Sequence, residues 1–79
     1  MKVVRKNTRG YYGMNHEAGK ELGIKDIPPK GTIYVNKELK GRMLKRTIAH
    51  EKFESYQMQN GMNYNKAHKL AMKFERNIK

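Results

Sequence analysis

The residues Thr47-Ile-Ala-His-Glu-Lys-Phe-Glu54 carry the strongest structural and chemical signal in this chain. On an α-helix, residues four positions apart lie one above the other on the same face. His50 and Glu54 can therefore bind one object between them, and Glu51 points about 100° round the helix, close enough to act on it. This is the geometry of the His-Glu-x-x-His zinc helix with a carboxylate in place of the second histidine. Carboxylate oxygen is also an accepted zinc ligand.

Length and composition limit what the chain can be. Its 79 residues allow a single domain, residues 1–79, with a thin core. Because the chain has no cysteine, any bound metal must be held by His, Asp or Glu. No apolar run approaches the about 20 residues that cross a bilayer, and no signal peptide follows Met1. We therefore expect a cytoplasmic protein with no membrane partner.

The charge balance raises a second possibility. With 18 Lys and Arg against 7 Asp and Glu, the formal net charge is +11, which favours attraction to nucleic acid. Tyr11 and Tyr12 stand beside basic residues of the N-terminal segment and could stack on bases. We expect them instead to fill out the thin core.

The N-terminal half predicts two strands and a short helix. Residues 2–5 can form an edge strand, and the glycines of residues 10–13 then interrupt it. Asn15 is a suitable N-cap for a helix that Gly23 would end. Thr32–Asn36, which is β-branched and aromatic, is the best strand in the sequence.

Two helices follow. A long helix is predicted from about residue 39 to residue 60, opened by Asn36 or a neighbour and ended by Gly61. Asn63 caps a second helix over about residues 64–77. The loop between them is short, so the helices should pack antiparallel. The fold class is therefore α+β, with a small sheet on an antiparallel pair of long helices.

Helical periodicity places the candidate metal ligands on the faces of the helices that should pack together. One ridge of the first helix consists of Met43, Thr47, His50, Glu54 and Met58, and a second, apolar strip consists of Ala49, Phe53 and Tyr56. On the second helix, His68 and Glu75 border the apolar stripe. Glu54 and His68 are each seven residues from Gly61, so both should lie about 10 Å from the turn. His50, Glu54 and His68 can then converge, with Glu75 as a further ligand or as a residue that holds a ligand from behind.

The distribution of charge supports this site. From residue 39 onward the only acids are Glu51, Glu54 and Glu75, and all three share a face with a histidine. Buried carboxylates and imidazoles are costly unless something pairs them, and a divalent cation, zinc or another, would do so. The alternative is a Glu–His hydrogen-bond network that only fixes the helix pair.

The run His50-Glu51-x-x-Glu54 followed by Tyr64-x-x-Ala67-His68-x-x-Ala71-x-x-x-Glu75 resembles the small zinc-dependent peptidases of the zincin class, in particular minigluzincins. It also looks like metallopeptidase-like proteins of phages and archaeal mobile elements. The resemblance implies that His50 and Glu54 bind zinc, that Glu51 is the general base of a hydrolase, and that His68 or Glu75 supplies the third ligand. Its substrate would be a peptide.

The alternative function is a basic nucleic-acid-binding module of a mobile element, in which the His/Glu cluster is only structural. One face of the last helix carries Lys66, Lys69, Lys73 and Arg76, which could lie along phosphates. The metal site would face inward and these side chains outward, so both functions could coexist. The sequence leaves the substrate, the metal and the oligomeric state open.

Overall fold

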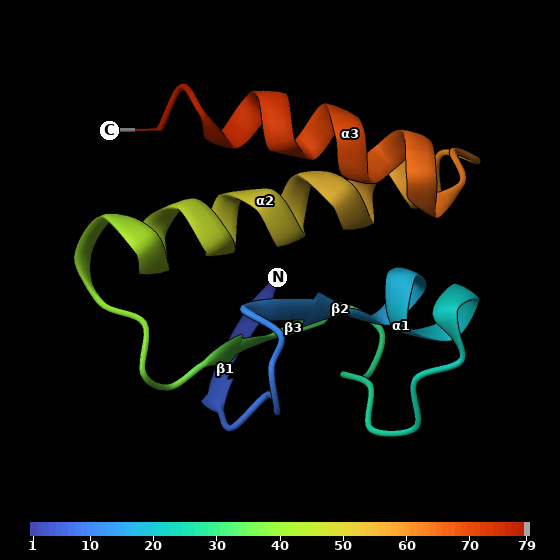
Figure 1. The fold of residues 1–79 in the computed structure, drawn as a ribbon. Helices are drawn as coiled ribbons and strands as arrows, with labels where there is room; N and C mark the ends of the chain where they lie inside the picture. The colour runs from blue at the N-terminus through green and yellow to red at the C-terminus, as the bar shows by residue number, and fades with distance from the viewer. Residues whose placement is uncertain (79) are drawn as a thin grey trace.

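The computed structural model of the chain describes residues 1–78 and confirms an α+β fold (Figure 1). Three short strands and three helices follow one another in the order β1 (Lys2–Lys6), β2 (Gly13–Asn15), α1 (His16–Leu22), β3 (Thr32–Asn36), α2 (Gly41–Gln59) and α3 (Tyr64–Glu75).

The sheet has the strand order β1-β3-β2, with β1 parallel and β2 antiparallel to the central strand β3. Successive side chains of a strand point to opposite faces. Ile33 and Val35 of β3 are fully buried on the face that packs against α2. This apolar face fixes the register of β3, because a slip of one residue would turn both side chains to the other side.

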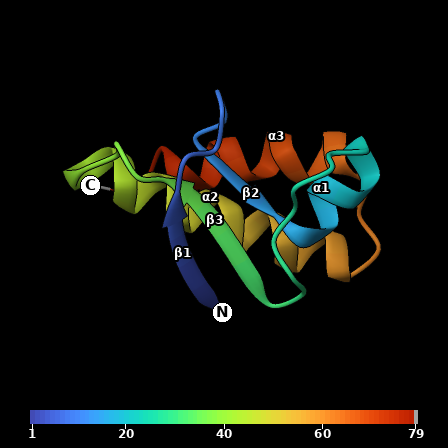
Figure 2. The ribbon, with the colours of Figure 1, turned by 90° about the horizontal axis from the view of Figure 1, so that it is seen from below.

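Helix α2 lies between the sheet and α3, so the molecule has three layers (Figure 1). Helices α2 and α3 run antiparallel and pack closely along their length. Small residues allow the close approach, because Ala67 and Ala71 of α3 are fully buried. Phe53 and Phe74 stack with ring centroids 4.6 Å apart. Seen from below, the sheet lies in front of α2 (Figure 2).

The predicted helix ends are mostly confirmed. Asn15 caps α1 by accepting a hydrogen bond from the Ala18 amide, and Asn63 caps α3 in the same way. Gly23 has a φ of 72° at the end of α1, a conformation that glycine adopts without a steric penalty. The start of α2 differs from the prediction, because its N-cap is Lys40, which makes no side-chain cap. Asn36 is instead the last residue of β3.

Two expectations about the N-terminal segment were wrong. Tyr11 and Tyr12 do not fill the core, since they are 44% and 62% exposed. The segment that follows them forms β2, which was not predicted. Three residues are too few to show an alternating pattern, and β2 exists because it pairs with β3. Tyr56, expected on a covered strip of α2, is also exposed.

None of the helices within residues 1–78 combines the length and the apolar character needed to cross a membrane.

Candidate metal centre

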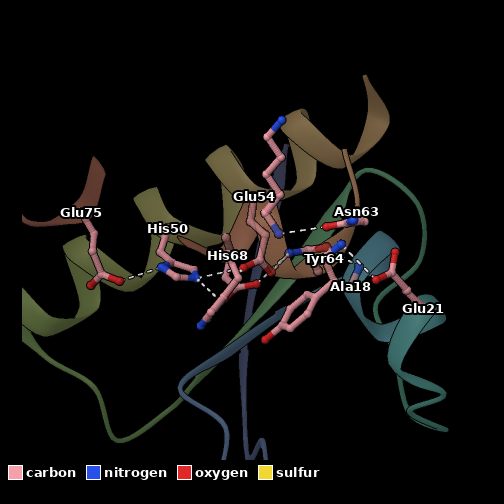
Figure 3. A network of polar contacts seen from close by, with 11 residues as sticks. Ala18, Glu21, His50, Glu54, Asn63, Tyr64, His68 and Glu75 are labelled. Carbon is pink, nitrogen blue, oxygen red and sulfur yellow. Dashed lines mark hydrogen bonds and ion pairs between the residues drawn. The ribbon is translucent and has the colours of Figure 1, made fainter. Parts of the chain in front are cut away.

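Two helices bring three predicted ligands together at one point. His50 and Glu54 lie one turn apart on α2, and His68 lies level with them on α3 (Figure 3). The Glu54 Oε2 atom is 3.1 Å from Nε2 of His50 and 2.8 Å from Nδ1 of His68. The two ring nitrogens are 3.3 Å apart. The antiparallel pairing about Gly61 therefore places the side chains as the helical rise predicts.

This triangle is compatible with a metal ion. Ligand atoms bound tetrahedrally at about 2.0–2.1 Å lie roughly 3.3 Å from one another, close to the three separations in this cluster. Two imidazole nitrogens and one carboxylate oxygen are also a donor set that divalent transition metals accept. His50, Glu54 and His68 thus form a cluster that could hold a metal ion.

The cluster lies deep between the elements. Glu54 is 2% exposed and His50 is 7% exposed, while the His68 side chain is 39% exposed and forms the solvent side of the cluster. Tyr64 stacks on the His68 ring with a centroid separation of 5.1 Å. The Tyr64 amide in turn donates to Glu21 of α1. The start of α3, and with it His68, is therefore tied to the sheet side of the molecule.

Glu75 bonds to the side of the His50 ring that faces away from Glu54. Its Oε1 atom lies 2.6 Å from Nδ1 of His50, the ring nitrogen opposite the one that faces Glu54 (Figure 3). Glu75 is not a member of the three-residue cluster. Histidines that bind metals almost always donate their second ring N–H to a group of this kind, which fixes the tautomer and raises the basicity of the ligating nitrogen.

Asn15 belongs to the hydrogen-bond network of the site, although the sequence had identified it only as a helix cap. Its Nδ2 atom donates to Glu54 Oε1 and to Glu51 Oε1, both at 2.9 Å. Its Oδ1 atom accepts the Ala18 amide at 2.8 Å. In the sequence, a role as a helix cap was a sufficient reason for an asparagine at position 15. Only the packing of β2 on α2 brings its amide to the two glutamates.

Glu51 lies beside the cluster on the buried side of α2. Burial, reinforced by the negative charge of Glu54, raises the pKa of Glu51 to about 7. A carboxyl group with a pKa near neutrality can accept a proton and release it again at physiological pH. Gly13 makes room for this side chain, because a Cβ atom there would lie 2.8 Å from Glu51 Cγ.

Without a metal ion, the hydrogen bonds of the cluster determine the protonation state of His50. Both of its ring nitrogens face a carboxylate oxygen, and both can bond only if both carry a proton. Burial alone would lower the pKa of His50, but the hydrogen bond to Glu54, the nearby carboxylate charges and Glu75 raise that pKa to about 9. Burial also disfavours the charged form of Glu54, which by itself would raise its pKa. The hydrogen bonds from His50, His68 and Asn15 outweigh this effect and lower the Glu54 pKa.

Within residues 1–78, every buried side-chain nitrogen and oxygen has a hydrogen-bond partner. The cluster can therefore also exist as a closed network that holds α2 and α3 together. The network and the metal centre are built from the same atoms, and they differ in whether a proton or a cation lies between Nε2 of His50 and the Glu54 carboxylate.

A cleft of about 510 Å³ opens onto the cluster. His50, Glu51, Glu54 and His68 line it together with exposed apolar and aromatic side chains, among them Tyr12, Met43 and Met72. Among the described residues, those that line the cleft include no lysine or arginine, although the chain carries 18 of them. The cleft thus combines apolar walls with the carboxylates and imidazoles of the cluster, and its lining offers no basic side chain to an anionic group.

The basic residues predicted as a nucleic-acid face lie elsewhere. Lys66, Lys69, Lys73 and Arg76 are all exposed along α3 and its end, and none of them lines the cleft.

Comparisons of the chain with protein-family models, with curated proteins and with solved structures found no match. The resemblance to minimal zincins therefore stays a prediction that rests on the motif residues alone.

Proposed function

We propose that the chain is a minimal metal-dependent hydrolase of the zincin type, with zinc held by His50, Glu54 and His68 and with a peptide as substrate. The observation that carries this proposal is the convergence of His50 Nε2, His68 Nδ1 and Glu54 Oε2, all within 3.3 Å of one another. Three protein ligands leave a fourth tetrahedral position open, as catalytic zinc sites require.

A zinc ion held there would supply Lewis acidity, which polarises a carbonyl group and makes water a stronger nucleophile at neutral pH. The carboxylate of Glu51 takes the proton from the attacking water and then gives it to the leaving amine. Asn15 orients Glu51 through its Oε1 atom. The apolar cleft wall accommodates the side chains of the substrate.

The metal part of the proposal is tested by elemental analysis of protein purified without a histidine tag. We expect one equivalent of zinc in the wild type and none after His68→Ala, whose exposed side chain makes this the mildest change in the cluster. The matched control is His16→Ala, because the His16 ring bonds to the Pro28 carbonyl, away from the cluster, and its loss should leave the metal in place. A wild type that binds no zinc at micromolar concentration, with a melting temperature unaffected by chelator, would favour the closed network.

The catalytic part is tested separately with Glu51→Gln. This variant should keep the metal and the fold but lose the hydrolysis of an unfolded protein substrate such as casein, by about 100-fold or more, because the base is absent. If the wild type binds zinc and Glu51→Gln hydrolyses at the same rate, the site is structural and the protein is not a hydrolase.

A second candidate function is favoured by the exposure of Lys66, Lys69, Lys73 and Arg76 on one side of α3. These cations could contact a phosphate backbone. The logarithm of the affinity should then fall linearly with the logarithm of the salt concentration, by about one slope unit for each contact. Changing Lys66, Lys69 and Lys73 to glutamine should lower the slope, whereas the same change at Lys45 and Lys52 of α2 should have a smaller effect.

A further inference from the structure

Another pocket lies beside the face of the sheet that turns away from α2. Figure 2 shows the ribbon from this side. Because Ile33 and Val35 face α2, Tyr34 between them faces outward. Met14, the partner of Tyr34 on β2, lies with it and Ile24 in a pocket of about 230 Å³. The pocket therefore has an aromatic and apolar lining.

Three cationic side chains also line the pocket, and they come from different segments. Lys6 ends β1, Arg9 lies in the loop between β1 and β2, and Lys25 follows α1. A single acid, Asp26, accompanies them. Unlike the cleft above the His/Glu cluster, this pocket combines a flat aromatic ring with a net positive charge.

The ring of Tyr34 already attracts a cation. Lys6 Nζ lies 4.4 Å from the ring centroid and forms an ion pair with Asp26 at 2.8 Å. The two side chains of that pair are 34% and 74% exposed, and exposed ion pairs contribute little to stability. Lys6 can therefore leave Asp26 for an anionic group, and a flat ligand can then occupy the face of Tyr34.

The loop that carries Arg9 has an unusual backbone. Arg9 has a φ of 50°, a left-handed conformation that residues other than Gly, Asn and Asp rarely adopt. The Asn7 side chain supports it by accepting a hydrogen bond from the Arg9 amide at 3.0 Å. Rare conformations of this kind cluster at ligand-binding positions, and here Arg9 lines the pocket.

We propose that this pocket binds one nucleotide, with an unpaired base stacked on Tyr34 and a phosphate held by Arg9 together with Lys6 or Lys25. The volume is below the about 300 Å³ at which pockets for larger ligands begin, which suits a single base. Base–aromatic stacking with basic side chains along the backbone is the usual means of binding single strands. The proposal does not depend on the metal centre.

The first test measures the affinity of the full chain for a fluorescein-labelled single-stranded octanucleotide, in DNA and in RNA form, by fluorescence anisotropy. Tyr34→Leu should weaken binding at least five-fold, the lower end of the loss expected when one stacking partner is removed. The matched control is Tyr56→Leu, because Tyr56 is exposed on α2 and outside the pocket. Binding by Tyr34→Leu within two-fold of the Tyr56→Leu control would overturn the proposal, as would the absence of binding by the wild type.

Tyr34 belongs to the central strand, so a second variant guards against a folding defect. Arg9→Gln changes an exposed loop side chain and should lower the salt slope of binding by about one unit. Lys52→Gln, which removes a charge from the exposed side of α2, is its control and should lower the slope less. Equal slopes for the two variants would overturn the assignment of the phosphate to this pocket.

Competition experiments distinguish a free nucleotide from a nucleotide that is part of a single-stranded nucleic acid. If unlabelled AMP or UMP displaces the labelled octanucleotide at micromolar concentration, and does so less well from Tyr34→Leu, the ligand is a free nucleotide. If only longer single strands compete, the ligand is a single-stranded nucleic acid. Both results support the base-and-phosphate chemistry of the pocket. Competition by inorganic phosphate that equals competition by AMP would remove the role of the base and overturn it.

Discussion

The Glu75 carboxylate of α3 lies 2.6 Å from Nδ1 of His50 on α2, behind the ring edge that faces the His/Glu cluster. With Nδ1 bonded to Glu75, the lone pair of Nε2 is the one that can point at a metal ion. This contact joins the last turn of α3 to the middle of α2. It therefore orients the His50 ring and also packs the helix pair.

We expect Glu75→Ala to weaken zinc binding by about 10- to 100-fold, because His50 would lose the acceptor that fixes its tautomer. Glu75→Gln should weaken binding less, since its amide oxygen can still accept the Nδ1 proton. Competition for zinc between each variant and a chromophoric chelator measures both affinities. Glu38→Ala, in the loop before α2, is the control with the same loss of charge. Equal affinities for Glu75→Ala and the wild type would show that Glu75 does not support a ligand.

The chelator-treated protein should become less stable as the pH rises from about 5 to 9. His50 has a folded-state pKa of about 9, above its unfolded value of about 6.5, so its contribution is complete below pH 6.5 and is lost as the pH approaches 9. Glu51 has a folded-state pKa of about 7, above its usual value, so its contribution is lost between about pH 4.5 and 7. The lowered Glu54 pKa acts oppositely and costs stability only at acidic pH.

Urea unfolding at pH 5, 7 and 9 measures this dependence, and the loss between pH 7 and 9 comes from His50. Saturating zinc should reverse the trend above pH 7, because metal ions compete better for imidazole when fewer protons are available. A free energy of unfolding that is constant or that increases from pH 5 to 9 without metal would contradict the imidazolium assignment.

Replacing Asn15 separates its two roles. Asn15→Asp keeps a good helix cap but removes the amide that donates to Glu51 and Glu54, and adds a third buried carboxylate. We expect a loss of about 2–4 kcal/mol in the free energy of unfolding. The matched control is Asn63→Asp, where the capping residue of α3 is exposed and the change should cost less than about 0.5 kcal/mol. Similar losses at both positions would mean that Asn15 matters only as a cap.

Gly13→Ala should test how closely β2 packs on α2. The new Cβ would lie 2.8 Å from Glu51 Cγ and 2.9 Å from Thr47 Cγ2, so the strand or the Glu51 side chain must move. We expect a loss of about 1–3 kcal/mol in stability, measured by urea unfolding. The loss should be smaller in a Thr47→Ser background, which removes one of the two contacts. An additive double-mutant cycle would contradict this packing.

Features that depend on residues close together in the chain could be predicted from the amino-acid sequence. Helical periodicity predicted that His50 and Glu54 share a face, and the rise per residue counted from Gly61 placed His68 level with Glu54. The caps at Asn15 and Asn63 and the strand at Thr32–Asn36 follow from the same local rules, because each depends on residues within a few positions of one another.

Contacts between distant elements could not be predicted in this way, because they depend on how the elements pack. Strand β2 has three residues and forms because β3 offers it hydrogen bonds, so its existence depends on a partner 20 residues away in sequence. That pairing carries the Asn15 amide to Glu51 and Glu54, and it makes Gly13 necessary beneath Glu51. The choice of Glu75 as the support of His50 depends on the packing of α2 on α3. A sequence specifies which faces are apolar, but hydrogen bonds between elements depend on distances that exist only after those faces have packed.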